Sequence, residues 1–275
     1  MANAPKPTTA QKENSKGSGI FAGLAILICI AIGWILFIFV MGDGSNFEGG
    51  DNANHPISGN YFGMIYKGGY IVPFLMSMLL MTFVFSIERF FVISKAAGVG
   101  NVDAFVRKVQ GFLASNNVDA AIGECDKQKG SVAAVIKSGL KKYKAVESDV
   151  VMDTEQKCLA IQKDIEEATA LEMPMLEQNL TIIATLVSVG TLGGLLGTVT
   201  GMIKAFGGLA TAGAPDQAQL ANGISEALIN TATGIATSLV AVISYNFFTS
   251  KIDSLTYSID EAGFSIVQTY AATHK

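Results

Sequence analysis

Charged residues are scarce in this sequence. Of its 275 residues only 15% are Asp, Glu, Lys or Arg, whereas soluble domains average about 25%. Half of the residues are hydrophobic. This balance indicates an integral membrane protein rather than a soluble domain. The net charge of −4 is too small to favour nucleic acid as a partner.

Cysteine and histidine are few as well. Cys29 lies in an apolar run, Cys125 and Cys158 lie in a charged segment, and the sequence has no C-x-x-C pair and no Cys/His cluster. It therefore predicts neither a metal site, nor a disulfide framework, nor a cofactor. His55 is interpreted as an exposed loop residue. The absence of a G-x-x-x-x-G-K loop argues against an ATP-driven transporter, and we predict no enzymatic activity.

Four long apolar runs are present instead, at residues 20–42, 68–87, 180–205 and 223–248. Each is about long enough to cross a bilayer as a helix, which takes roughly 20 apolar residues. The fold class predicted from them is an all-α integral membrane protein with four transmembrane helices and a cytoplasmic helical bundle. The first run follows a basic tail, but it is too long for a signal peptide and no A-x-A site follows it. We therefore expect an uncleaved helix.

The polar stretches between the runs complete the predicted organisation. In order, the segments are a disordered cytoplasmic tail (1–19), an extra transmembrane helix (20–42), a periplasmic loop (43–67), a transmembrane helix (68–93), a cytoplasmic helical domain (94–178), a transmembrane helix (179–206), a periplasmic loop (207–222), a transmembrane helix (223–250) and a cytoplasmic C-terminal helix (251–275). Apolar residues recur at helical spacing in the helical domain. Its last helix is expected to continue into the membrane, with Pro174 as a kink.

The distribution of Lys and Arg predicts the orientation. Eleven of the nineteen fall in residues 95–178 and three precede residue 20, whereas the stretch 43–67 holds only Lys67. By the positive-inside rule the N-terminus and the helical domain lie in the cytoplasm. With four spans, both termini are then cytoplasmic.

The last two apolar runs differ from ordinary membrane anchors. The first is rich in glycine at spacings that let helix backbones approach closely in lipid, and the candidate packing residues are Gly190, Gly194, Gly197 and Gly201. The second contains a single charged residue, Glu226. A carboxylate inside a membrane is costly and is by default a functional hypothesis.

Polar residues continue from Glu226 along its helix. On a helical wheel Glu226, Asn230, Thr233 and Thr237 fall within about 40° of one another, and Thr231 serves a different face. Burial in the membrane favours the neutral form of the Glu226 carboxyl, which can exchange a proton when water reaches it. These residues are therefore candidates for a proton path.

Three motifs carry a resemblance to a known family: GLLGTVTGMIKAF at 194–206, GISEALINTATG at 223–234, and YN at 245–246. The sequence resembles the MotA/TolQ/ExbB proton-channel family, in its ExbB/TolQ branch, from Pro73 to the C-terminus. Thr191 stands where that family commonly has proline, so the glycine-rich segment is expected to be less kinked. The family's three spans match the last three runs here, which makes residues 20–42 an addition.

The resemblance implies roles and partners. Thr198 and Thr231 match the family's pore-lining threonines, and Glu226 matches its intramembrane glutamate. It further implies a homopentamer in the bacterial inner membrane, surrounding an ExbD/TolR-like single-span protein whose aspartate carries the proton. A TonB- or TolA-like protein then uses the proton-motive force for work across the periplasm on the outer membrane.

Other interpretations remain open. The chain can serve a TonB-type system or, like TolQ, the Tol-Pal envelope system. It can also be a non-conducting membrane scaffold in which Glu226 only holds helices together. Threonines in membrane helices usually bond the carbonyl one turn back, which is the structural interpretation of Thr198. Lys204, near a helix end, is expected to extend to the membrane interface.

Overall fold

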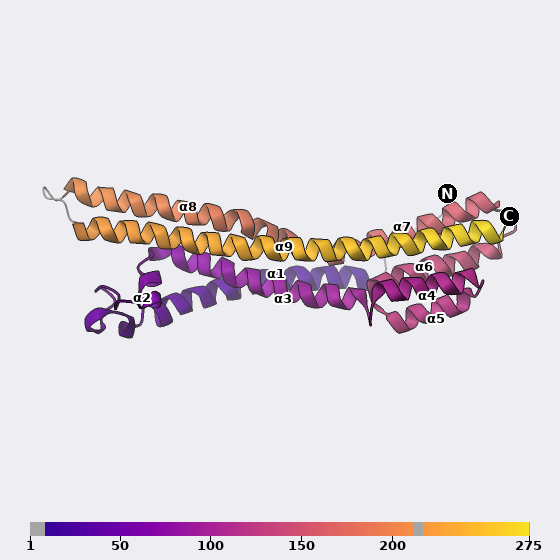
Figure 1. Ribbon diagram of the computed structural model, residues 1–275, viewed down its shortest axis with the longest axis horizontal. Coiled ribbons are helices and arrows are strands. Elements are labelled where there is room, and N and C mark those ends of the chain that lie inside the picture. Colours follow the sequence, from indigo (N-terminus) through magenta and orange to yellow (C-terminus); the bar gives the residue numbers. More distant parts are fainter. Residues whose placement is uncertain (1–8, 212–216, 275) are drawn as a thin grey trace. The chain divides into compact units, whose positions relative to one another are not determined.

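The computed structural model describes residues 9–211 and 217–274, and within them every regular element is a helix. The long helices are α1 (Thr9–Ile35), α3 (Val72–Ala97), α7 (Thr154–Glu177), α8 (Leu180–Thr211) and α9 (Gln217–Thr273) (Figure 1). The shorter ones are α2 (Tyr61–Tyr66), α4 (Val102–Ala114), α5 (Val118–Gln128) and α6 (Gly130–Glu147). A π-helical turn (Leu36–Met41) extends α1, and 3-10 turns follow at Gly44–Asn46, Glu48–Gly50 and Gly69–Ile71.

The predicted all-α membrane fold with four spans is confirmed. Four helical stretches of the described chain are long and apolar enough to cross a membrane, at Ile20–Met41, Gly69–Ala114, Thr154–Gly207 and Gln219–Thr273. Pro73 is the second residue of α3, where its missing N–H costs little because the first N–H groups of a helix have no partner within it.

Two predicted boundaries are wrong. Helix α1 begins at Thr9 rather than at residue 20, so the tail predicted to be disordered over 1–19 was too long, and residues 1–8 lie outside the described part. The loop predicted at 207–222 is shorter, because α8 continues to Thr211 and α9 starts at Gln217. The residues between these two helices are also outside the described part.

The kink expected at Pro174 is found a turn later. Pro174 lies within α7, and the chain turns at Asn179, whose φ of 62° is left-handed. Asparagine tolerates this conformation better than most residues. The freed carbonyls at the end of α7 are satisfied by Arg89, a buried residue that donates to the carbonyls of Met175 and Leu176, both at 3.1 Å.

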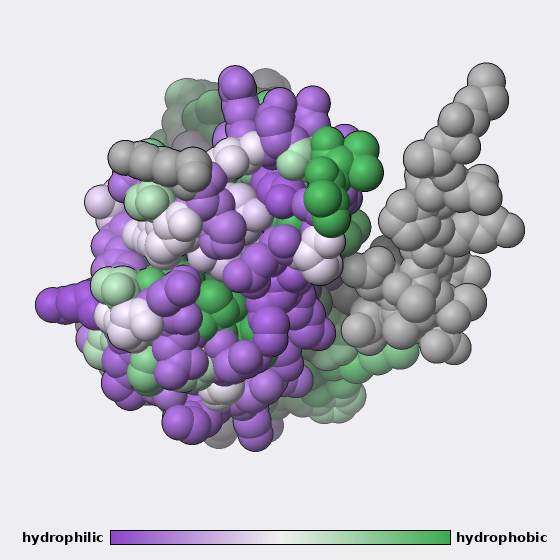
Figure 2. All heavy atoms as spheres, turned by 90° about the vertical axis from the view of Figure 1, so that its right-hand side faces the viewer, coloured by the Kyte–Doolittle hydropathy of each residue, from purple (hydrophilic) through white to green (hydrophobic). Residues whose placement is uncertain are grey.

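The chain forms two compact units. The first comprises residues 1–86 and 182–245, and the second residues 87–181 and 246–275. In the first unit α1 packs against α3, where Trp34 and Phe74 meet edge to face at 5.8 Å. In the second unit α4 to α7 and the end of α9 share a core that includes Val109, Leu140 and Tyr270. The face of this second unit seen in Figure 2 is mostly hydrophilic.

Candidate functional site

Helices α8 and α9 form a hairpin whose backbones touch. The packing candidates Gly190, Gly194, Gly197 and Gly201 are all buried. A Cβ added at Gly194 would lie 3.1 Å from the carbonyl oxygen of Asn230, and one at Gly201 would lie 2.8 Å from the backbone nitrogen of Ala227. Glycine on α8 therefore removes the side-chain volume that would hold α9 away.

The partner helix supplies glycine at the same contact. A Cβ added at Gly234 would lie 2.6 Å from the carbonyl oxygen of Gly190 and 2.7 Å from Cα of Gly194. Near the other end of the contact, one added at Gly223 would lie 2.6 Å from Cβ of Ala205. The close approach thus runs over several turns and fixes which residues of the two helices face each other.

This register brings Thr198 and Thr231 together. Their hydroxyl oxygens are in direct hydrogen-bond contact. Each hydroxyl oxygen also lies 3.1 Å from the carbonyl oxygen one turn back in its own helix, that of Gly194 for Thr198 and that of Ala227 for Thr231. A hydroxyl has one proton to donate, so when one threonine donates across the hairpin the other donates along its helix. The pair can adopt two hydrogen-bond patterns.

Glu226 lies in a narrow space between α8 and the turn before α3. Its Oε1 accepts from Nζ of Lys204 at 2.5 Å, and its side chain is only 12% exposed. On the other side stands Gly69, with a φ of 76°, where an added Cβ would lie 2.5 Å from Oε1. A side chain at position 69 would therefore strain the backbone and collide with the carboxylate.

Asn230 and Thr237, predicted to share a face with Glu226, are buried against the beginning of α3. Asn230 donates through Nδ2 to the carbonyl of Gly68 at 3.0 Å, and Thr237 contacts the carbonyl of Leu75 at 3.4 Å. Oδ1 of Asn230 is buried with no hydrogen-bond partner among the described atoms. A buried acceptor of this kind calls for an explanation, such as a bound water.

The structure therefore divides the predicted residues into four groups. Thr198 and Thr231 meet across the hairpin, and Asn230 binds the turn before α3. Glu226 contacts Lys204. Thr233 is half-buried and donates to the carbonyl of Ile229 in its own helix at 2.8 Å.

Lys204, which we expect to extend to the membrane interface, forms an ion pair with Glu226 across the hairpin. A signal for this contact was present in the sequence. Residues equally distant from the turn of an antiparallel helical hairpin face each other, and Lys204 and Glu226 are nearly equidistant from the turn, as are Thr198 and Thr231. Helical periodicity within one helix carries no such information.

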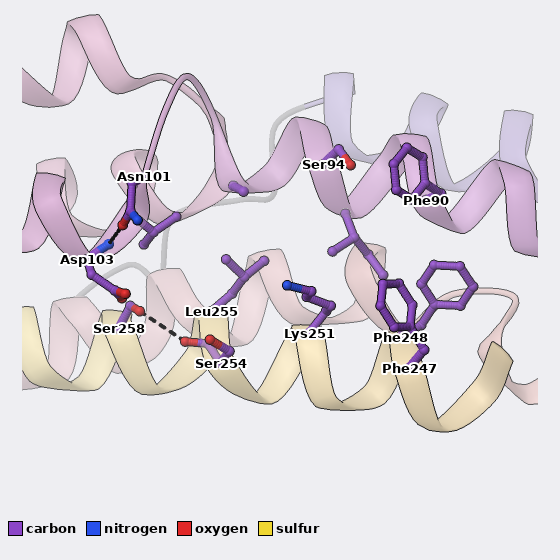
Figure 3. A pocket seen from close by; sticks show the side chains of 13 residues that line it. Phe90, Ser94, Asn101, Asp103, Phe247, Phe248, Lys251, Ser254, Leu255 and Ser258 are labelled. Carbon is purple, nitrogen blue, oxygen red and sulfur yellow. Dashed lines mark hydrogen bonds between the residues drawn. The ribbon is translucent and has the colours of Figure 1, made fainter. Parts of the chain in front are cut away.

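The second unit holds a separate hollow, a pocket of about 370 Å³ that Figure 3 shows in close-up. Phe90, Phe247 and Phe248 gather at one end of it, and Asn101 and Asp103 lie at the other end. No group of three or more potential metal-ligating side chains lies together in the described chain.

Comparison with known proteins gives a consistent result. The sequence model of the MotA/TolQ/ExbB proton channel family matches residues 127–261, which include the described part of the α8–α9 hairpin. "Tol-Pal system protein TolQ" of Pseudomonas aeruginosa is 29% identical over 154 residues, which cover 56% of this chain and 67% of that protein.

Shorter matches include relatives named TolQ and relatives named ExbB. "Tol-Pal system protein TolQ" of Haemophilus influenzae is 37% identical over 84 residues, 30% of this chain and 37% of that protein. "Biopolymer transport protein ExbB" of Salmonella typhimurium is 33% identical over 85 residues, 31% of this chain and 35% of that protein. These two alignments span little more than a third of the relatives' own lengths. The family match and these relatives together support the MotA/TolQ/ExbB proton channel family, in its ExbB/TolQ branch, as the family of this chain.

Proposed function

We propose that this chain is a proton-channel subunit of an ExbB/TolQ-type complex in the bacterial inner membrane, which couples the proton-motive force to work on the outer membrane. The observation that carries the proposal is Glu226, a carboxylate set into the apolar α9 and enclosed by Lys204 and Gly69. A carboxylate in such a position can take up and release a proton within the membrane.

The neighbouring polar groups support a path for protons. Hydroxyl groups cannot store charge at neutral pH. Thr198 and Thr231 can, however, exchange the roles of donor and acceptor in the hydrogen bond between them. The unpartnered Oδ1 of Asn230 offers an acceptor for water in the same helix pair. Thr233 continues the polar residues one turn further along α9, so Glu226, Thr198, Thr231, Asn230 and Thr233 form the proposed path.

A single subunit has no evident means of turning proton flow into work. We therefore propose a homo-oligomer, a pentamer as in the family, around an ExbD/TolR-like single-span protein that supplies a second carboxylate. A TonB- or TolA-like protein would transmit the work. In this arrangement both termini and the α4–α7 region are cytoplasmic, and residues 43–67 are periplasmic. Relatives named ExbB and TolQ both match, so either system fits the chain.

The contact with Lys204 also supports a second candidate function. An ion pair between two helices can hold a scaffold together without moving protons, and breaking a buried pair by removing one partner is destabilising. The two functions make opposite demands on Glu226, since a channel needs its titration and a scaffold needs only its contacts.

The variant Glu226→Gln separates these functions. The amide keeps the size of the side chain and most of its hydrogen bonds but cannot titrate. We expect the variant to be produced at the normal level and to co-purify with its partner, yet to lose proton-dependent uptake or envelope integrity. Asp253→Asn is the matched control, because Asp253 is an exposed carboxylate further along α9. Full activity of Glu226→Gln would refute the channel role and favour the scaffold.

A further inference from the structure

We propose that Lys204 is the resting counter-ion of Glu226, holding the carboxylate ionised and the proton path closed until the lysine leaves. The proposal rests on the proposed function above and adds to it a residue with a defined task. Lys204 comes from α8 and Glu226 from α9, and their charged atoms Nζ and Oε1 are 2.5 Å apart.

The two partners are enclosed to different extents. The side chain of Glu226 is 12% exposed, whereas that of Lys204 is 54% exposed. Glu226 is confined by Gly69, which leaves no room for a side chain between the turn and the carboxylate. The lysine approaches from the open side on a flexible four-carbon stem. The ion pair therefore opens by movement of Lys204 and not of Glu226.

No other described cation competes for this carboxylate. Lys67, which precedes the turn at Gly68 and Gly69, donates instead to the carbonyls of Asn52 and Ala53, at 2.9 and 3.1 Å. Asn230, one turn along α9, donates to Gly68. The charge of Glu226 is balanced by Lys204.

The ion pair compensates the charge of the carboxylate within the apolar helix. An unpaired carboxylate in an apolar surrounding is costly, whereas a close opposite charge favours the ionised form. With Nζ of Lys204 2.5 Å from Oε1, the carboxylate of Glu226 is engaged with the lysine and is not available to the proton path.

Opening follows from exchange of partners. When a second carboxylate or the interfacial water attracts the ammonium of Lys204, Glu226 is left unpaired and takes one proton from water on its open side. The carboxyl then carries the O–H bond, and Lys204 keeps its three ammonium protons. When the carboxyl gives its proton to the next acceptor, the carboxylate is restored and the ion pair re-forms, so one proton has moved and no charge has been lost.

Dicyclohexylcarbodiimide tests this directly, because it modifies protonated carboxyls in apolar surroundings and the adduct on Glu226 can be quantified by peptide mass spectrometry. In membranes at neutral pH we expect slow modification of the wild type. Modification of Lys204→Gln should be faster, on the order of tenfold, because no close opposite charge then favours the ionised carboxylate. Lys204→Arg should remain as slow as the wild type, and Lys251→Gln serves as the lysine control.

A second variant keeps the test decisive if Lys204→Gln is poorly assembled. In Lys204→Cys, with Cys158→Ser to remove a half-buried thiol, a methanethiosulfonate that adds an ammonium group should restore protection of Glu226. One that adds only a methyl group should not. Equal modification of Glu226 with and without the positive charge would overturn the proposal.

The outcomes for the two proposals are distinguishable. If Glu226→Gln is inactive but carbodiimide modification of native Glu226 does not depend on the charge at position 204, the channel function stands and the counter-ion role fails. If the modification depends on that charge while Glu226→Gln is fully active, the ion pair is real but the channel role of Glu226 is refuted.

Discussion

At the scale of single residues, burial sets the chemistry of Cys125. Its side chain is 2% exposed in the second unit. Burial, and secondarily the charge of Asp126, raises the pKa of its thiol to about 12. The thiolate is the reactive form. At pH 8 the thiolate fraction of a thiol with pKa 12 is about one in ten thousand, compared with about a quarter for an ordinary cysteine.

We therefore expect Cys125 of the folded protein to escape modification by N-ethylmaleimide at pH 8, while half-buried Cys158 reacts. In denaturant all three cysteines should react. The raised pKa also affects stability, since the folded state favours the neutral thiol. The contribution of the neutral Cys125 thiol to the free energy of unfolding is fully present below the unfolded pKa of about 8.5. It is lost as the pH rises towards 12. Rapid labelling of Cys125 in the folded protein, found by peptide mass spectrometry, would contradict this expectation.

Glu226 and Lys204 differ in how much of their role can be predicted from the sequence. Glu226 stands out in the sequence because a lone carboxylate in an apolar run is conspicuous. The ion pair of Lys204 is not visible in the pattern of its own helix, because its partner Glu226 lies on another helix. Which charges meet depends on the register between helices, and in this chain backbone contacts between glycines set that register.

At the scale of elements, the α8–α9 hairpin makes a sharp prediction. In Gly234→Ala the new Cβ would meet backbone atoms of Gly190 and Gly194 at 2.6 and 2.7 Å, and backbone cannot rotate away as a side chain can. The helices must separate, at a cost of about 1–3 kcal/mol. We expect a lower melting temperature in detergent and weaker association with the partner protein.

Gly207→Ala is the matched control, because an added Cβ at that position of α8 has nothing within 4 Å. It should be neutral or stabilising by up to about 1 kcal/mol, the helix-propensity difference between the two residues. Equal melting temperatures for Gly234→Ala and Gly207→Ala would show that the hairpin contact contributes little to stability.

The elements themselves were predictable to different degrees. Four spans follow from four apolar runs, since only helices of that length satisfy their backbone in lipid. The start of α1 at Thr9 was missed because the polar residues before the apolar run gave no signal for helix. The break at Asn179 was missed because proline was taken as the stronger signal, whereas Arg89, remote in sequence, stabilises the end of α7.

At the scale of the whole molecule, the orientation in the membrane can be tested with a pair of cysteines. Ser58 lies in the loop between α1 and α3 and is exposed. Val150, between α6 and α7, is 96% exposed. The proposed topology places Ser58 in the periplasm and Val150 in the cytoplasm.

In cells with a permeabilised outer membrane, an impermeant maleimide should label Ser58→Cys and leave Val150→Cys unlabelled until the inner membrane is lysed. Both variants are made in a background with Cys158→Ser, so that the half-buried native thiol does not contribute. The reverse pattern would invert the orientation, and early labelling of both would show that the two sites share the periplasmic side.

The contacts between glycines of α8 and α9 also bear on how this sequence can diverge during evolution. At Gly194 and Gly234 the neighbouring atoms include backbone, which every residue type possesses. No substitution elsewhere can therefore shrink them to make room for a larger residue. We expect purifying selection to preserve both glycines across descendants of this gene. Leu195 and Leu196, which are exposed on the same helix, should exchange freely with other apolar residues.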